Sequence, residues 1–408
     1  MTATWRSFFI HRYGLDLRSL AIFRISLSLL IAIYLGLELV ATDLSWRSAC
    51  LGAALAGALL MAIGYRSRWA AAATWLLVTL LYNSSMLSST APSPLLPAAV
   101  LWGVLLPLAG SYSIDQALNT VEQPKSIFSG ATLGLMIQLL ALYWLEVASW
   151  QTAAAAVFPS LGLATFAATL AVPLLLWNPE HASRCRTIAA AAAVVIHGGW
   201  FCLAAGGWQS LLALSLWLAL MPSAVWDRLA IRAFTPQRLG LNIYYDADCG
   251  FCKKVVHLLR TLLVLPRRVP LRTAQSDPAI HTAMETQNSW VIVDWQGQHY
   301  YKWQGIAYVV SLSPVFWPLA RVLRWRPLMA LGTRLYETIA NNRRVAGRFT
   351  KPLKFQQFVV RPRPLVSLVG LAVALAILWS SIQQVSVIRR TVPAPPPLVR
   401  AIEISPVR

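Results

Sequence analysis

One short stretch in the middle of the chain decides how its region folds: Asp246-Ala247-Asp248-Cys249-Gly250-Phe251-Cys252. A strand-like apolar run at 241–245 precedes it, and a helical pattern at 253–265 follows it. We expect Cys249 to lie at the start of that helix, where free N–H groups and the helix dipole stabilise a thiolate. Cys252, about one turn later, can then form a disulfide with it. The spacing predicts a dithiol redox site.

The composition of the rest of the chain is that of a membrane protein. Of its 408 residues, 57% are hydrophobic, 12% are charged and 18 are Trp. Soluble proteins are about 25% charged, and Trp is enriched where a membrane meets water. The net charge of +20 does not indicate nucleic acid, because the basic residues lie mostly beside apolar runs. We therefore expect membrane lipids as partners and no nucleic acid.

About nine apolar segments approach the ~20 residues that a helix needs to cross a bilayer. They lie near 18–40, 49–64, 69–88, 94–110, 127–148, 155–177, 187–206, 209–227 and 364–383. Arg and Lys gather in alternate loops, so the positive-inside rule predicts that the N-terminus and the region after the eighth segment are cytoplasmic. The Pro-rich tail is then outside. We expect a multi-pass protein of a bacterial-type inner (plasma) membrane, with no cleavable signal peptide.

Region 236–352 differs from the apolar segments in its pattern. Runs at 241–245, 269–271, 290–293 and 299–302 alternate with helical stretches, as in a small α/β domain. The sequence thus predicts three parts. Residues 1–235 form a membrane bundle of about eight helices, 236–352 a cytoplasmic α/β domain, and 353–408 a last transmembrane helix (364–383) with its tail.

The residues near the cysteine pair indicate which chemistry the pair carries out. No further Cys or His pair lies near enough to complete a zinc site, so a redox dithiol is favoured over a metal site or an unreactive pair, and no metal is expected. Cys249 is the predicted attacking thiol and Cys252 the resolving thiol. Asp246 and Asp248 either relay the proton released by the thiol, or one of them only caps the helix. The dithiol itself requires no cofactor.

Four ionisable residues fall within the apolar segments, where such groups are costly and often functional: Arg24, Glu38, Glu146 and His197. His197 lies near the middle of its segment. If it shares a cavity with Glu146, the two would handle protons for a quinone or a lipid-like ligand. The alternatives are a neutral, hydrogen-bonded His197, an Arg24 that extends to the membrane surface, and solvated carboxylates at Glu38 and Glu146.

The cytoplasmic region resembles the DCC family of thiol-disulfide oxidoreductases. Asp246, Cys249 and Cys252 match the Asp-x-x-Cys-x-x-Cys motif of that family, and Tyr336-Glu337-Thr338-Ile339-Ala340-Asn341-Asn342-Arg343 is similar to its closing helix. The resemblance implies a thioredoxin-like fold and thiol–disulfide exchange.

The N-terminal segments resemble the HTTM family of membrane domains, which is related to vitamin K-dependent γ-carboxylase. The matching stretches are 16–24, 64–68 and 174–179, together with His197. The lysine expected after Glu146 is absent, because the chain continues Val147-Ala148-Ser149-Trp150. We therefore expect no vitamin K-type carboxylation.

Three functions follow from these patterns. The first is a membrane-anchored protein-disulfide reductase whose Cys249–Cys252 dithiol acts on a disulfide-containing protein or a small thiol. The second places the main chemistry on a quinone or lipid-like substrate in the bundle, with the dithiol as electron donor. The third is a non-enzymatic anchoring or redox-sensing subunit.

Overall fold

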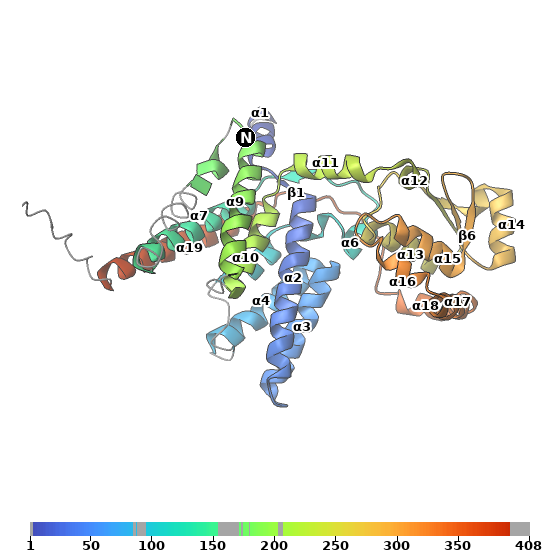
Figure 1. Cartoon of the computed structure of the whole chain (residues 1–408), viewed down its shortest axis with the longest axis horizontal. Coiled ribbons are helices and arrows are strands. Elements are labelled where there is room, and N and C mark those ends of the chain that lie inside the picture. Colours follow the sequence, from blue (N-terminus) through green and yellow to red (C-terminus); the bar gives the residue numbers. More distant parts are fainter. Residues whose placement is uncertain are drawn as a thin grey trace, which may run out of the picture.

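The computed structural model describes residues 3–84, 87, 95–153, 171–172, 174–178, 180–202 and 207–391, with the backbone alone at 3–6, 144–153 and 384–391. Most of the predicted segment 155–177 and the tail beyond residue 391 lie outside this description. Within it, a bundle of helices is joined to a small domain of strands and helices (Figure 1).

The bundle is built from helices and two short strands that precede residue 234, together with the last helix. They are α1 (Ala3–Tyr13), β1 (Leu15–Asp16), α2 (Leu17–Val40), α3 (Trp46–Ile63), α4 (Ser67–Asn83), α5 (Leu95–Leu105), η1 (Leu108–Gly110), α6 (Ile114–Ala117), β2 (Ser126–Ile127), α7 (Gly130–Ala153), α9 (Ala182–Cys202), α10 (Gly207–Ala219), α11 (Ser223–Ala233) and α19 (Pro364–Thr391).

Several of these helices suit a membrane. Among the described residues, α2, α3, α9 and the Pro364–Gln383 part of α19 are long and apolar enough to cross one, and a fifth span results if α10 and α11 count as one. The apolar helix α5 and the apolar part of α7, Gly130–Tyr143, are shorter. The predicted number of nine spans therefore stays a prediction.

The eighth predicted segment, 209–227, is not one straight helix. It divides into α10 and α11, which meet at an angle of 81°. Pro222 stands before α11, and its ring removes the backbone donor that would continue α10, while the residue before a proline avoids the helical conformation. None of the side chains of α11 is buried. The apolar segment 209–227 is therefore bent at Pro222 and does not form a single straight helix.

Helices α7 and α19 pack closely through small residues. A side chain at Gly130 would clash with the backbone of Ser367, and one at Gly134 or Gly370 would clash with the facing helix. Small residues of this kind let helix backbones approach in membranes. The last helix is therefore an integral part of the bundle.

Arg24 and Glu38 do not reach solvent as expected. Arg24 is fully buried, and its guanidinium donates to the carbonyls of Leu108, Ser111 and Tyr112 at 2.7, 3.3 and 2.6 Å. Glu38 is 8% exposed and forms a 3.0 Å ion pair with Arg47. Burial of a charge is tolerated when such partners surround it. Arg24 thus fixes the loop around η1 rather than extending to the membrane surface.

The small α/β domain contains a four-stranded sheet. Its elements are α12 (Pro236–Leu239), β3 (Asn242–Tyr245), α13 (Gly250–Leu262), β4 (Leu271–Thr273), η2 (Ala274–Ser276), α14 (Pro278–Gln287), β5 (Val291–Val293), β6 (His299–Tyr301), α15 (Lys302–Ser311), α16 (Leu319–Leu323), α17 (Arg326–Asn341) and α18 (Arg343–Phe349). The strand order is β4-β3-β5-β6, with β3 parallel to β4 and antiparallel to β5, and β5 antiparallel to β6.

Both faces of this sheet are covered, as an α/β domain requires. One core joins Ile243 and Ile292 of the sheet to Cys252 and Val256 of α13 and Val309 of α15. The second core lies on the other face and joins Tyr244 and Val291 to Ile280 and Met284 of α14. The ends of each observed strand lie within two residues of the ends of the predicted run.

The helix that carries the cysteines rests against the bundle. Helix α13 packs on α6, which lies between the bundle and the sheet (Figure 1). The segment that leads from α18 to α19 crosses the same place: Gln356 exchanges backbone hydrogen bonds with Leu118 and Thr120, at 2.9 and 3.1 Å. The α/β domain is therefore attached to the bundle by packing as well as by the chain.

Candidate active site

The two motif cysteines lie at the start of α13, immediately after β3. They form a disulfide with their Cα atoms 5.2 Å apart. Cys249 is the N-cap residue of the helix, and its sulfur accepts a hydrogen bond from the backbone N–H of Cys252 at 3.2 Å. The predicted placement of the pair at a helix N-terminus is thus what the structure shows, and α13 begins three residues earlier than the sequence pattern indicated.

The two sulfurs differ in their access to solvent. Cys249 is partly exposed and is followed by the exposed Gly250, whereas Cys252 is only 2% exposed and belongs to the core beneath the sheet. A thiol that attacks a substrate disulfide must be reachable, and a resolving thiol need reach only its neighbour. The geometry therefore suits Cys249 as the attacking thiol.

Asp246 organises the loop before the cysteines. Its carboxylate accepts hydrogen bonds from the backbone N–H of Asp248 at 3.1 Å and from the side-chain amide of Gln275 at 2.9 Å, and it forms an ion pair with Arg343 at 3.5 Å. Gln275 also accepts from the N–H of Ala247 at 3.1 Å. The loop is thus held by residues from β4–α14 and α18.

Neither aspartate caps α13, because that position is taken by Cys249. The capping alternative for Asp246 and Asp248 is therefore wrong. The side chain of Asp248 is exposed. A proton-relay role for the two carboxylates stays a prediction.

The basic side chains near the start of α13 are engaged by the segment after α18. Lys254 donates to the carbonyl of Thr350 at 2.8 Å, and the Lys253 ammonium lies 5.2 Å from the centre of the Phe355 ring. His257 meets the edge of the same ring. Burial, and then the nearby Arg260 and Lys253, lower the pKa of His257 to about 4, against a hydrogen bond with the Ala117 backbone. His257 is therefore neutral at pH 7.

The stretch that resembles a closing helix contacts the sheet beside the disulfide. Within α17, the Tyr336 hydroxyl accepts from the N–H of Trp290 at 3.1 Å, and Glu337 pairs with Lys302 at 2.6 Å. Trp290 shares a core with Cys252. Helix α17 thus packs against the residue that leads into β5.

A second polar cluster lies inside the bundle. The Tyr143 hydroxyl is 3.1 Å from Nε2 of His197 and accepts from the indole N–H of Trp217 at 2.9 Å. All three side chains are buried. The backbone of Glu146 lies in α7, but its side chain is outside the described part, so its proximity to His197 stays a prediction. Tyr143 and Trp217 were not predicted, because neither carries a charge that marks it in an apolar segment.

Metal ligands do not gather anywhere in the described part of the chain: no group of three or more His, Cys, Asp or Glu side chains there could hold an ion.

Comparison with known proteins points to the same site. Residues 243–349 match the model of a family described as DCC1-like thiol-disulfide oxidoreductase. No curated protein and no solved structure is significantly similar to the chain. The matched region begins in β3, contains both cysteines and ends with α18. This region is similar to thiol-disulfide oxidoreductases of the DCC1-like family, and the similarity supports a thiol–disulfide redox role for its cysteine pair.

Proposed function

We propose that the protein is a membrane-anchored thiol-disulfide oxidoreductase that reduces or exchanges a disulfide in a protein or a small thiol. The observation that carries the proposal is the unequal placement of the two cysteines, with a reachable Cys249 at the N-terminus of α13 and a buried Cys252 one turn later. The order of the sheet, with a parallel β3–β4 pair and an antiparallel β5–β6 pair, supports a thioredoxin-like domain.

The reaction begins from the reduced pair. The Cys249 thiolate attacks one sulfur of the substrate disulfide, whose S–S bond breaks, and the second sulfur leaves as a thiolate that takes up a proton. The Cys252 thiolate then attacks the Cys249 sulfur and releases the first substrate sulfur. The substrate gains two electrons and two protons, and the pair ends as the disulfide of this structure. A dithiol or thiol reductant of the same compartment restores the pair.

The location is part of the proposal. The apolar helices are compatible with a membrane protein, and Arg228, Arg232 and Arg238 lie between α10 and β3. The positive-inside rule supports a cytoplasmic α/β domain on a bundle in an inner membrane. A resemblance of that bundle to the HTTM family remains a prediction.

The test uses the purified full chain in detergent with a thiol reductant and a protein disulfide as substrate. We expect Cys249→Ser to abolish reduction and Cys252→Ser to accumulate a mixed disulfide on Cys249. Cys202→Ser is the matched control, because Cys202 is exposed but lies in α9, and its activity should equal that of the wild type. An active Cys249→Ser variant would refute the proposal.

The buried cluster in the bundle favours a second candidate, a bundle that binds a quinone or lipid-like substrate and receives electrons from the dithiol. Tyr143, His197 and Trp217 offer hydrogen-bonding groups that would orient such a ligand. A radiolabelled short-chain quinone should bind the wild type, and His197→Ala should bind it at least several-fold more weakly. Thr187→Ala, an α9 variant at a half-buried position ten residues before His197, is the control. Equal binding by all three proteins would reject this candidate.

A further inference from the structure

Four segments of the bundle meet at a small pocket at the end where α4, α7 and α19 begin. Its lining includes Arg68 from the first turn of α4, Pro107 after α5, and Arg361 and Arg363 from the segment that enters α19. Three arginines and no acidic residue line this pocket. The concentration of positive charge therefore has no balancing carboxylate in the pocket wall.

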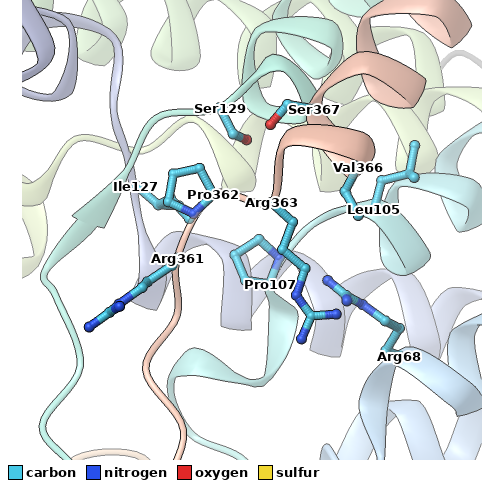
Figure 2. Close-up of a pocket in the computed structure, with 10 residues that line it drawn as sticks. All are labelled: Arg68, Leu105, Pro107, Ile127, Ser129, Arg361, Pro362, Arg363, Val366 and Ser367. Atoms are coloured by element: carbon cyan, nitrogen blue, oxygen red, sulfur yellow. The ribbon is translucent and has the colours of Figure 1, made fainter. Parts of the chain in front are cut away.

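Two of the arginines lie side by side. Figure 2 shows the guanidinium groups of Arg68 and Arg363 next to each other, while Arg361 points away on the other side of Pro107. The charges of Arg68 and Arg363 repel each other. Among the described residues, no side-chain hydrogen bond or ion pair joins either guanidinium to the protein. The two arginines that are buried in the described part of the bundle, Arg24 and Arg186, donate to backbone carbonyls. Arg68 is half-buried and Arg363 is exposed.

Like charges held together without a partner favour an anion between them. A guanidinium presents paired N–H donors that match the oxygens of a phosphate. The long helix α19 begins at Pro364, directly after Arg363, and its first turn adds partial positive charge. These features select a phosphate group in preference to a neutral ligand.

The surroundings indicate where the phosphate comes from. On α19, the first turns after Arg363 expose the apolar side chains of Leu365 and Leu368, at 73% and 66%. A charged group at the two arginines would thus be followed by an apolar surface running along the helix. This is the order of headgroup and acyl chain in a phospholipid, and basic pockets between membrane helices bind anionic headgroups.

We propose that Arg68 and Arg363 form a binding site for the phosphate of an anionic phospholipid, whose acyl chains lie against the outer face of α19. The site requires the bundle to lie in a bilayer, but it is independent of the dithiol chemistry. Its failure would therefore leave the redox proposal unchanged, and the reverse also holds.

The experiment measures lipid retention by native mass spectrometry of the full chain in detergent. Phosphatidylglycerol is titrated against phosphatidylcholine, and inorganic phosphate is added in a separate arm. We expect the wild type to retain phosphatidylglycerol preferentially. The double variant Arg68→Gln, Arg363→Gln should bind it about tenfold more weakly, because both charge-assisted contacts are lost. Arg232→Gln, which alters an exposed arginine of α11 outside the pocket, should stay within about twofold of the wild type.

A thermal unfolding measurement in lipid-free detergent separates binding from folding. The double variant should unfold at the same temperature as the wild type or at a higher one, because the repulsion between the two arginines has been removed. A lower temperature would show that the arginines are structural and would overturn the proposal. So would equal retention of phosphatidylglycerol by the wild type and the double variant. Displacement of the lipid by millimolar inorganic phosphate would assign the site to free phosphate and would also overturn it.

Discussion

Replacing Cys252 by alanine isolates Cys249 while leaving its hydrogen-bond donor in place, because that donor is the backbone N–H of residue 252. In this variant we expect the pKa of Cys249 to lie below the ~8.5 of a free cysteine. The reason is the position of its sulfur at the N-cap of α13, facing the open first turn of the helix.

The size of the effect follows from the contacts. A hydrogen bond to a charged acceptor contributes at least about 1.5 kcal/mol, and the helix N-terminus adds about 0.5 kcal/mol. The exposed Asp248 carboxylate opposes the thiolate by about 0.5 kcal/mol, as expected for a solvated charge. The net stabilisation of about 1.5 kcal/mol corresponds to roughly tenfold more thiolate at pH 7.

The assay is the rate of alkylation against pH, read by mass spectrometry of the peptide that contains residue 249. A short cysteine peptide is the reference. In the complementary Cys249→Ala variant, Cys252 should react far more slowly, because it is 2% exposed. Lys253→Gln with Lys254→Gln is the control: both lysines interact with the segment after α18, so we expect less than about a twofold change.

Two results would refute this reasoning. If Cys249 titrates at or above the value of the free thiol, the helix N-terminus does not stabilise its thiolate. If Cys252 reacts faster than Cys249, the attacking and resolving thiols have been assigned in the wrong order.

Three further changes test other parts of the structure. Gln275→Ala removes two hydrogen bonds from the loop before the cysteines. The rate of disulfide turnover should therefore fall several-fold, while the unfolding temperature changes little. An unchanged turnover would show that Gln275 does not position the loop. Below its ordinary value of about 6.5, His257 takes up a proton in the unfolded chain but not in the folded one, where its pKa is about 4. The free energy of unfolding is therefore not lowered by His257 above pH 6.5, and it falls as the pH drops from 6.5 towards 4. The loss is less than about 2 kcal/mol, because the ring is partly solvated. Thermal unfolding of His257→Gln should depend less on pH over this range. Gly332→Ala places a methyl group against the Trp303 ring and should destabilise the α/β domain by about 1–3 kcal/mol; denaturant unfolding of the purified chain measures it.

The local parts of the site could be predicted from the sequence. A strand, a Cys-x-x-Cys pair and a helix follow one another within about twenty residues, so their order alone places Cys249 at the helix N-terminus. The prediction of one segment at 209–227 followed its apolar character, whereas Pro222 within it separates α10 from α11.

The partners of the site could not be predicted in the same way. Gln275 and Arg343 reach Asp246 from 29 and 97 positions away. Buried Arg24 likewise depends on carbonyls more than 80 positions away. Such contacts depend on how elements pack, and no periodic pattern in a single sequence encodes them.

The helical bundle does more than tether the α/β domain. Arg24 of α2 holds the loop around η1, and Asp115 of α6 accepts hydrogen bonds from the backbone N–H groups of Arg66 and Ser67 at the start of α4. Helix α6 is thereby fixed to the bundle, and α13 packs on it. The side of α13 that carries His257 is covered by α6 and by Phe355. A flexible tether would let the cysteines approach a substrate from any direction, whereas this arrangement holds the helix that carries them in one orientation to the bundle. The proposed reaction therefore requires a substrate disulfide to reach the exposed end of α13, where Cys249 and Gly250 lie.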